Sequence, residues 1–252
     1  MAKQGALGAR LYLAGYDHTN DVGAVSRVGG GPVALDVTGI DKGAPERVGG
    51  QRDGGIDFAP WFNPAAGKIH ARLSLLPTTD QVATFGVSGA LGDPAASVLG
   101  KQLNYDGTRG QDGAFSFGVT LPGNGFGLEW GRWLTTASRT DSAATNGTSV
   151  DLGAASPGAF GLQAYLHVFA FAGTDVTVKI QESSDNGAGD AFADVVGGGF
   201  TQITSSTPQA QRIATAAINV ERYLRVVTVT STSFSNLVFA VMAVRNDTAT
   251  VF

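Results

Sequence analysis

The chain has 252 residues, a net charge of −4 and no cysteine, which excludes disulfide scaffolds, thiolate metal sites and cysteine nucleophiles. Glycine accounts for 36 residues, and charged residues for only 15%, while 43% of the chain is hydrophobic. This composition predicts turn-rich β-structure with enough apolar material for a core. The chain also lacks the basic excess that tight binding to phosphate backbones requires.

The N-terminus has no long apolar run after its first lysine, so it does not resemble a signal peptide. The longest apolar run, residues 237–244, suits a buried strand and is too short to cross a bilayer. We therefore expect a soluble protein that is not secreted and does not contact a membrane.

In the first half of the chain, apolar runs alternate with clusters of glycine, proline, aspartate and asparagine, which favour turns. One helix is expected at 64–76, because Asn63 and Pro64 suit a helix start and Pro77 a stop. Ile69, Leu73 and Leu76 would form its apolar face. The expected strands are 9–16, 33–40, 56–62, 81–88, 97–105, 114–121 and 125–134.

Residues 135–158 are almost all small and polar, without a periodic apolar face. This stretch predicts a linker at 139–158 between a domain at 1–138 and a second at 159–252. The second domain shows strand patterns only, which predicts an antiparallel β-sandwich. Its expected strands are 160–171, 176–181, 199–203, 209–215, 223–229 and 237–244.

A search for chemistry finds no zinc-protease, phosphate-loop or serine-hydrolase motif. His18, His70 and His167 share no local context; we expect a loop histidine, a partly exposed helix histidine and a half-buried strand histidine. The acidic loops 106–113 and 182–190 offer oxygen ligands for calcium, but their residues are also ordinary in hairpins. The sequence predicts no catalytic residue, cofactor or metal, and no enzyme.

Residues 34–64 carry a more specific pattern, ALDVTGIDKGAPERVGGQRDGGIDFAPWFNP, in which two strands flank a charged loop and lead into a helix start. Together with LYLAGYD and NDVGAVS before it and a late Gly-Leu-Glu-Trp strand, this pattern resembles the major tail (tail tube) proteins of long-tailed bacteriophages. The resemblance covers about residues 7–138. The later part is similar to the β-sandwich domains appended to phage tail and capsid proteins.

This resemblance implies an all-β protein with one short helix. The N-terminal tail tube domain would be a β-sandwich or barrel, followed by a jelly-roll, galectin-like or immunoglobulin-like sandwich. Subunits would assemble in the host cytoplasm into stacked, hexameric rings of a virion tail tube, together with other tail proteins. DNA would pass through the lumen without specific binding.

Two surface roles follow from this resemblance. The long hairpin loop would contact the next ring through six charged residues: Asp41, Lys42, Glu46, Arg47, Arg52 and Asp53. Alternation along the strands places Asp36 and Asp57 on one face, where carboxylates would repel DNA phosphates in a lumen. A solvent face of an ordinary sandwich explains the same alternation.

Two other functions remain open at this point. In one, the C-terminal sandwich binds surface glycans through the aromatic residues Phe192, Phe200 and Phe234 near turns. In the other, the chain is a head-decoration protein; the lack of a long helix pattern argues against a capsid shell subunit.

Overall fold

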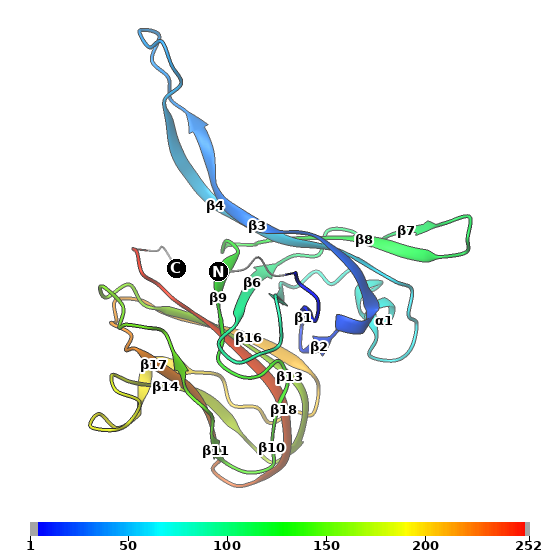
Figure 1. Cartoon of the computed structure of the whole chain (residues 1–252). Coiled ribbons are helices and arrows are strands. Elements are labelled where there is room, and N and C mark those ends of the chain that lie inside the picture. The colour runs from blue at the N-terminus through cyan, green and yellow to red at the C-terminus, as the bar shows by residue number, and fades with distance from the viewer. Residues whose placement is uncertain (1–4, 250–252) are drawn as a thin grey trace. The chain divides into compact units, whose positions relative to one another are not determined.

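The computed structural model describes residues 5–249. Nearly all regular structure in this part of the chain is β, arranged in three antiparallel sheets, which confirms the expected fold class (Figure 1). The described residues form two compact units. Unit 1 contains residues 5–20, 81–97 and 129–249, and unit 2 contains residues 21–80 and 98–128.

A nine-stranded sheet dominates unit 1, in the order β16-β13-β18-β9-β6-β5-β1-β2, with β10 paired to β18. Its longest strand pairing is the antiparallel pair of β13 and β18, whose residues are mostly apolar and mostly buried. The strands are β1 (Arg10–Leu13), β2 (Tyr16–Asp17), β5 (Gln81–Gly86), β6 (Pro94–Gly100), β9 (Glu129–Trp133), β10 (Arg139–Asp141), β13 (Leu162–Gly173), β16 (Gln209–Thr215) and β18 (Phe234–Arg245).

The second sheet of unit 1 has the order β11-β17-β14-β15, with β12 paired to β17. Its strands are β11 (Thr145–Asn146), β12 (Val150–Asp151), β14 (Thr177–Ser183), β15 (Ala193–Gly199) and β17 (Tyr223–Val229). Alternate residues of both sheets, such as Leu166 in β13 and Ile180 in β14, are fully buried in one core. This arrangement is the antiparallel β-sandwich predicted for the C-terminal part.

Unit 2 is built on a four-stranded sheet in the order β3-β4-β8-β7. Its strands are β3 (Val22–Asp36), β4 (Arg47–Pro60), β7 (Asp106–Arg109) and β8 (Phe115–Pro122). The 3-10 turn η1 (Thr19–Asp21) precedes β3, and the helix α1 (Ile69–Leu73) follows β4. The β3–β4 hairpin extends from the rest of unit 2 as a long arm (Figure 1).

Both the domain boundaries and the linker differ from the expectation. Strands from the N-terminus and from 81–97 belong to the same unit as the C-terminal half, because they pair side by side in one sheet. The expected linker at 139–158 contains β10, β11 and β12, which pair with β18 and β17. These strands are two or three residues long and contain a single apolar residue, Val150, so they leave no apolar pattern in the sequence.

The helix is shorter than expected. It begins at Ile69, with Lys68 as N-cap, because Gly67 has a φ of +73° that a helix does not accept. Asn63 instead stabilises the preceding turn: its side chain accepts a hydrogen bond from the Ala65 amide at 3.2 Å. Ile69 and Leu73 are buried as predicted, but Leu76 lies beyond the helix and is half exposed.

The hairpin register was also predicted incorrectly. Strands at 33–40 and 56–62 with a loop at 41–54 were expected, whereas β3 and β4 pair from Val22 with Pro60 to Asp36 with Arg47. Glycines at 29–31, 49–50 and 54–55 remove the alternating side-chain pattern from most of this ribbon. At Gly30 a Cβ atom would lie 2.3 Å from the Asp53 carbonyl oxygen, so this close approach requires glycine.

Candidate functional site

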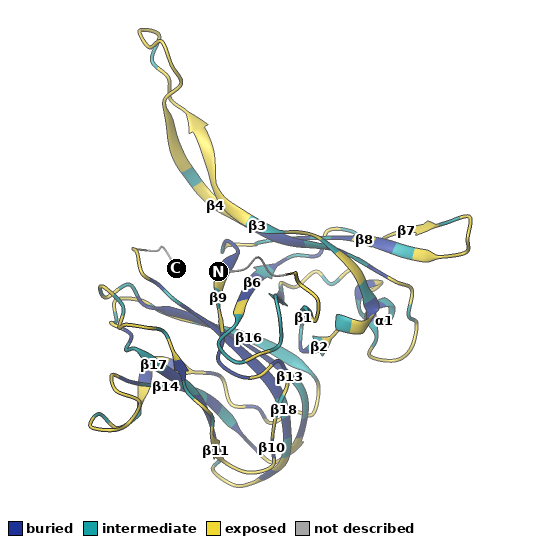
Figure 2. Cartoon of the chain, viewed as in Figure 1, coloured by how far each residue is buried: buried dark blue, intermediate teal, exposed yellow. Residues whose placement is uncertain are grey.

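The outer part of the β3–β4 hairpin has no third strand paired to it in the described structure. β8 pairs with β4 only from Gly55 to Phe58, and the Gly54 carbonyl accepts the Gly123 amide, so residues 29–53 form a two-stranded ribbon (Figure 2). We call these residues the distal ribbon. An isolated two-stranded hairpin is marginally stable in water. This ribbon is therefore the segment of unit 2 that most needs a partner.

Apolar side chains are exposed along the distal ribbon. Ile40 is fully exposed and Val33 is 53% exposed. The other exposed apolar residues of the ribbon are Leu35, Val37 and Val48. Exposed apolar side chains gathered on one segment indicate a candidate interaction site.

The tip of the ribbon, residues 36–46, is held by its own hydrogen bonds. The Asp36 carboxylate accepts hydrogen bonds from the Thr38 amide at 2.9 Å and the Thr38 hydroxyl at 2.5 Å. The Thr38 hydroxyl oxygen in turn accepts the Glu46 amide at 2.9 Å. The two bonds from Thr38 lower the pKa of Asp36, which therefore stays ionised. The tip is a defined turn that presents charge and Ile40 outward.

The six predicted contact residues fall into two groups. Asp41, Lys42 and Glu46 lie in the tip, where Lys42 Nζ and Glu46 Oε1 are 3.4 Å apart. Arg47, Arg52 and Asp53 lie in β4 and not in a loop, paired in register with Asp36, Pro32 and Gly31 respectively.

The two predicted lumen residues are far apart on the hairpin. Asp36 ends β3 at the tip, whereas Asp57 lies in β4 opposite Arg27 near the base. Asp57 Oδ2 is 3.9 Å from Arg27 Nη1, and Asp57 Oδ1 accepts the Leu121 amide at 3.3 Å. The structure therefore does not bring these carboxylates together, because the observed pairing is shifted from the expected one.

A second set of exposed apolar side chains, which the sequence pattern did not predict, lies beyond the other end of the same hairpin. Trp61 and Phe62 directly follow β4, and Leu75 and Leu76 come just after α1. Their exposed fractions range from 42% for Phe62 to 69% for Leu75. We call these four residues, with Lys68 and Arg72, the base patch. The adjacent Trp-Phe and Leu-Leu pairs are the sequence signal that could have indicated it.

An aromatic cluster supports the base patch from beneath. The Phe62 ring lies 4.7 Å from the His70 ring, edge to face, and 5.4 Å from the ring of Phe115. The rings of Tyr105 and Phe117 stack at 4.0 Å, and His70 Nδ1 is hydrogen-bonded to the Tyr105 hydroxyl at 3.2 Å. His70 is thus partly buried among aromatic rings, which fits the expected structural role.

The other histidines are more buried than predicted. His167 is 1% exposed; its Nε2 is hydrogen-bonded to Thr84 Oγ1 at 2.8 Å, and its Nδ1 accepts the Gly15 amide at 3.3 Å. His18, expected in a polar loop, is also 1% exposed. Burial, with a smaller contribution from His18, lowers the pKa of His167 to about 3. The pair belongs to the interior of unit 1.

Within residues 5–249 no group of three or more histidine, aspartate and glutamate side chains is placed to hold a metal ion. In the loop 182–190 the Asp185 carboxylate accepts backbone amides from Gly187, Ala188, Gly189 and Asp190. These bonds lower the pKa of Asp185 and occupy its oxygens. The loop is a hairpin turn stabilised by its own aspartate.

The aromatic residues considered for glycan binding are mostly internal. Phe200 and Phe234 are 4% and 7% exposed and belong to the sandwich core. Phe192 is partly buried beneath the Arg225 guanidinium, 4.0 Å from the ring centre.

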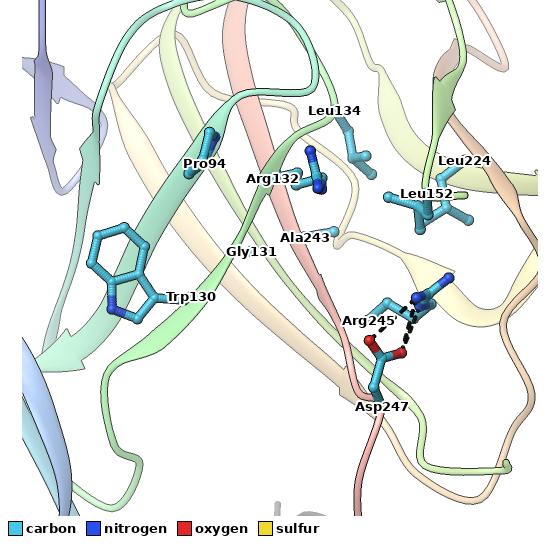
Figure 3. A pocket seen from close by; sticks show the side chains of 10 residues that line it. All are labelled: Pro94, Trp130, Gly131, Arg132, Leu134, Leu152, Leu224, Ala243, Arg245 and Asp247. Atoms are coloured by element: carbon cyan, nitrogen blue, oxygen red, sulfur yellow. Dashed lines mark hydrogen bonds and ion pairs between the residues drawn. The ribbon is translucent and has the colours of Figure 1, made fainter. Parts of the chain in front are cut away.

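Unit 1 contains a pocket of about 340 Å³ at one end of its two sheets (Figure 3). Its charged groups are already bonded: Arg245 pairs with Asp247 at 2.9 Å, and Arg132 donates to the Gly92 carbonyl at 2.9 Å. The pocket is lined by Pro94, Trp130, Gly131, Arg132, Leu134, Leu152, Leu224, Ala243, Arg245 and Asp247. Across the described part of the chain, no helix is long and apolar enough to span a membrane.

No family model matches the sequence, and no curated protein matches it significantly. Among solved structures, the Dit protein of phage SPP1, described as a paradigm of the hub adsorption apparatus in phages that infect Gram-positive hosts, is 15% identical. The match covers 94% of this chain and 98% of that one, with a TM-score of 0.32.

Two structures of the phage P2 baseplate in its activated conformation also match. The strontium-bound one is 9% identical with a TM-score of 0.31, and the calcium-bound one is 11% identical with a TM-score of 0.32. Both matches cover 95% of this chain and 99% of the other.

Proposed function

We propose that this chain is a structural subunit of a long-tailed phage tail, and that it self-assembles into stacked rings that form the tail tube. The sequence pattern at 34–64 supports this proposal through its resemblance to tail tube proteins. The observation that carries it is the distal ribbon, a long two-stranded arm with exposed apolar side chains and no third strand paired to it among the described residues. Such an arm suits assembly rather than a monomer.

Assembly would depend on surfaces that are left exposed in a single chain and are covered by further copies. Unpaired strand edges and an apolar ribbon are aggregation hazards in a monomer, and pairing with further copies removes them. A contact between two different surfaces of identical chains closes into a ring or continues as a filament, depending on the rotation between copies. In a stack of rings, the contacts within each ring close, whereas the contacts between rings continue along the tube.

DNA would pass through such a tube without specific binding, in keeping with a net charge of −4. The lumen position of Asp36 and Asp57 stays a prediction. Each has an arginine as register partner, Arg47 and Arg27, so each would contribute to a charge-balanced wall.

Negative-stain electron microscopy of the purified chain over a range of concentrations tests the proposal. Rings or tubes with a central bore are the expected result. Dispersed monomers at every concentration would contradict self-assembly.

A further inference from the structure

The sequence contains three asparagine–glycine pairs: Asn124-Gly125, Asn146-Gly147 and Asn186-Gly187. Asparagine is a thermolabile residue, and in such a pair glycine places no side chain between its own nitrogen and the asparagine. The glycine nitrogen attacks the asparagine Cγ atom, a C–N bond closes a succinimide ring, and ammonia leaves with the proton that the glycine amide gives up. Water then opens the ring to aspartate or isoaspartate. The glycine amide must be free of other hydrogen bonds for this attack.

Two of the three glycine amides are held by hydrogen bonds in unit 1. The Gly147 amide donates to the Val226 carbonyl at 2.8 Å, next to the pairing of β11 with β17. The Gly187 amide donates to Ser183 Oγ at 2.8 Å and to Asp185 Oδ1 at 3.1 Å. Ring closure at the asparagine before either glycine therefore requires that these bonds break first.

The third pair lies in the loop that follows β8 in unit 2, and its glycine is not held in this way. The Gly125 amide has no hydrogen-bond acceptor among the described residues. Gly125 has a φ of +77°, and a Cβ atom built on it would meet nothing within 4 Å, so the backbone has space to turn. Asn124 and Gly125 are both exposed to the water that the reaction consumes. The fold therefore leaves ring closure open at Asn124.

The side chain of Asn124 is a hydrogen-bond donor to a carboxylate. Its Nδ2 donates to both oxygens of Asp80, at 3.0 Å each, and Lys101 Nζ lies 3.2 Å from Asp80 Oδ1. The hydrogen bond from Asn124, followed by that from Lys101, lowers the pKa of Asp80, which therefore stays ionised. Conversion of Asn124 to an acid replaces this donor by a second carboxylate, and like charges repel.

The same loop also holds the base of the distal ribbon. The Asn124 amide donates to the Leu99 carbonyl at 2.9 Å, and the Gly123 amide donates to the Gly54 carbonyl at 2.7 Å. Gly54 directly follows the distal ribbon in β4. Repulsion between Asp80 and an acid at position 124 would act directly beside these two backbone bonds.

We propose that Asn124 deamidates in the folded protein while Asn146 and Asn186 do not, and that the product loosens the loop at the base of the distal ribbon. The reaction consumes water and needs no cofactor. An aged chain then differs from a new one by one negative charge in this loop. The inference concerns a single chain, so it stands independently of the tail tube function.

Incubation of the purified chain at mildly alkaline pH, followed by digestion and peptide mass analysis, tests the site. We expect the peptide that contains Asn124 to convert to its acidic form with time, while the peptides that contain Asn146 and Asn186 keep their amides. The chain unfolded in guanidinium chloride is the matched control, because without the fold all three pairs should convert at similar rates. Equal conversion of the three pairs in the folded chain, or an intact Asn124, would overturn the proposal.

The variant Asn124→Asp copies one product and tests the structural consequence. Hydrogen exchange at the Gly123 amide, followed by NMR, should be several-fold faster in this variant than in the natural chain, because the loop opens more often. Asn186→Asp is the control, since it adds the same charge in unit 1 and should leave exchange at Gly123 unchanged. Equal exchange at Gly123 in the two variants would overturn the loosening of the loop.

Discussion

Asp36 and Arg47 are the last register partners of the β3–β4 ribbon, and the chain makes its entire turn between them. Everything beyond this pair is largely exposed and bonded to the tip itself, through Thr38, Glu46 and the Lys42–Glu46 ion pair. The end of the ribbon is thus exposed to solvent in the single chain. Its contacts remain to be made with another molecule.

Removal of the distal ribbon should separate folding from assembly. Replacing residues 32–52 by Asn-Gly keeps the Gly31–Asp53 pair and supplies a tight hairpin turn. We expect the melting temperature to stay close to that of the full chain, because this segment contributes no buried core residue, while rings and tubes are lost. Thermal unfolding by circular dichroism and negative-stain microscopy measure the two effects. A truncated chain that still forms tubes would contradict the role of the ribbon.

Charge reversal at the end of the ribbon should impair assembly more than folding. Glu46 and Lys42 are about half exposed, and exposed ion pairs contribute only about 0.2–1 kcal/mol. The double variant Glu46→Lys, Arg47→Glu should therefore unfold at nearly the same urea concentration as the natural chain but give fewer tubes. Sedimentation of assembled material, compared at equal protein concentration, provides the measurement. An unchanged tube yield counts against the contact.

The buried charge network of unit 1 should be essential for stability. Glu129 and Arg212 are a buried ion pair with 3.3 Å between Oε1 and Nη2, and the Tyr165 hydroxyl donates to the Glu129 carboxylate. Arg212→Met removes the cation and leaves the Glu129 charge buried, which should cost about 3–5 kcal/mol of unfolding free energy. Urea unfolding measures the loss.

A companion double variant tests the same network. Glu129→Gln combined with Arg212→Met removes both charges, so its loss should be smaller than the sum of the two single losses. If the loss of unfolding free energy in the double variant equals the sum of the two single losses, Glu129 and Arg212 do not stabilise each other.

The stability of unit 1 should fall in mild acid because of His167. Burial lowers the pKa of His167 to about 3, against about 6.5 in the unfolded chain, so below pH 6.5 the unfolded state binds a proton that the folded state does not. The contribution of His167 is fully present above pH 6.5 and falls by up to about 1.4 kcal/mol per pH unit toward pH 3. Urea unfolding between pH 5 and 7 isolates this window from most carboxylates. The His167→Gln variant should have a flatter dependence, and an identical slope would refute the assignment.

Strands with apolar alternation were predictable from sequence. The strands expected at 209–215 and 223–229 coincide with β16 and β17, because each has β-branched or aromatic residues between clear turn signals. The sandwich core follows from the same alternation. The scarcity of helix patterns also indicated the fold class.

The candidate site was only partly predictable. Asp41, Lys42 and Glu46 were placed correctly in a charged turn, but Arg47, Arg52 and Asp53 belong to a strand. Glycine leaves no side-chain period, so the register of the ribbon could not be derived locally. The base patch depends on which apolar residues stay exposed at the end of β4 and after α1, and this follows from tertiary packing.

A reconstruction of the assembled protein by cryo-electron microscopy tests the central claim most directly, since it would place the ribbon of each subunit. The account predicts a hollow tube in which the tip at 36–46 of one ring lies against the neighbouring ring. A particle without a bore, or one whose ribbons project freely into solvent, would contradict it.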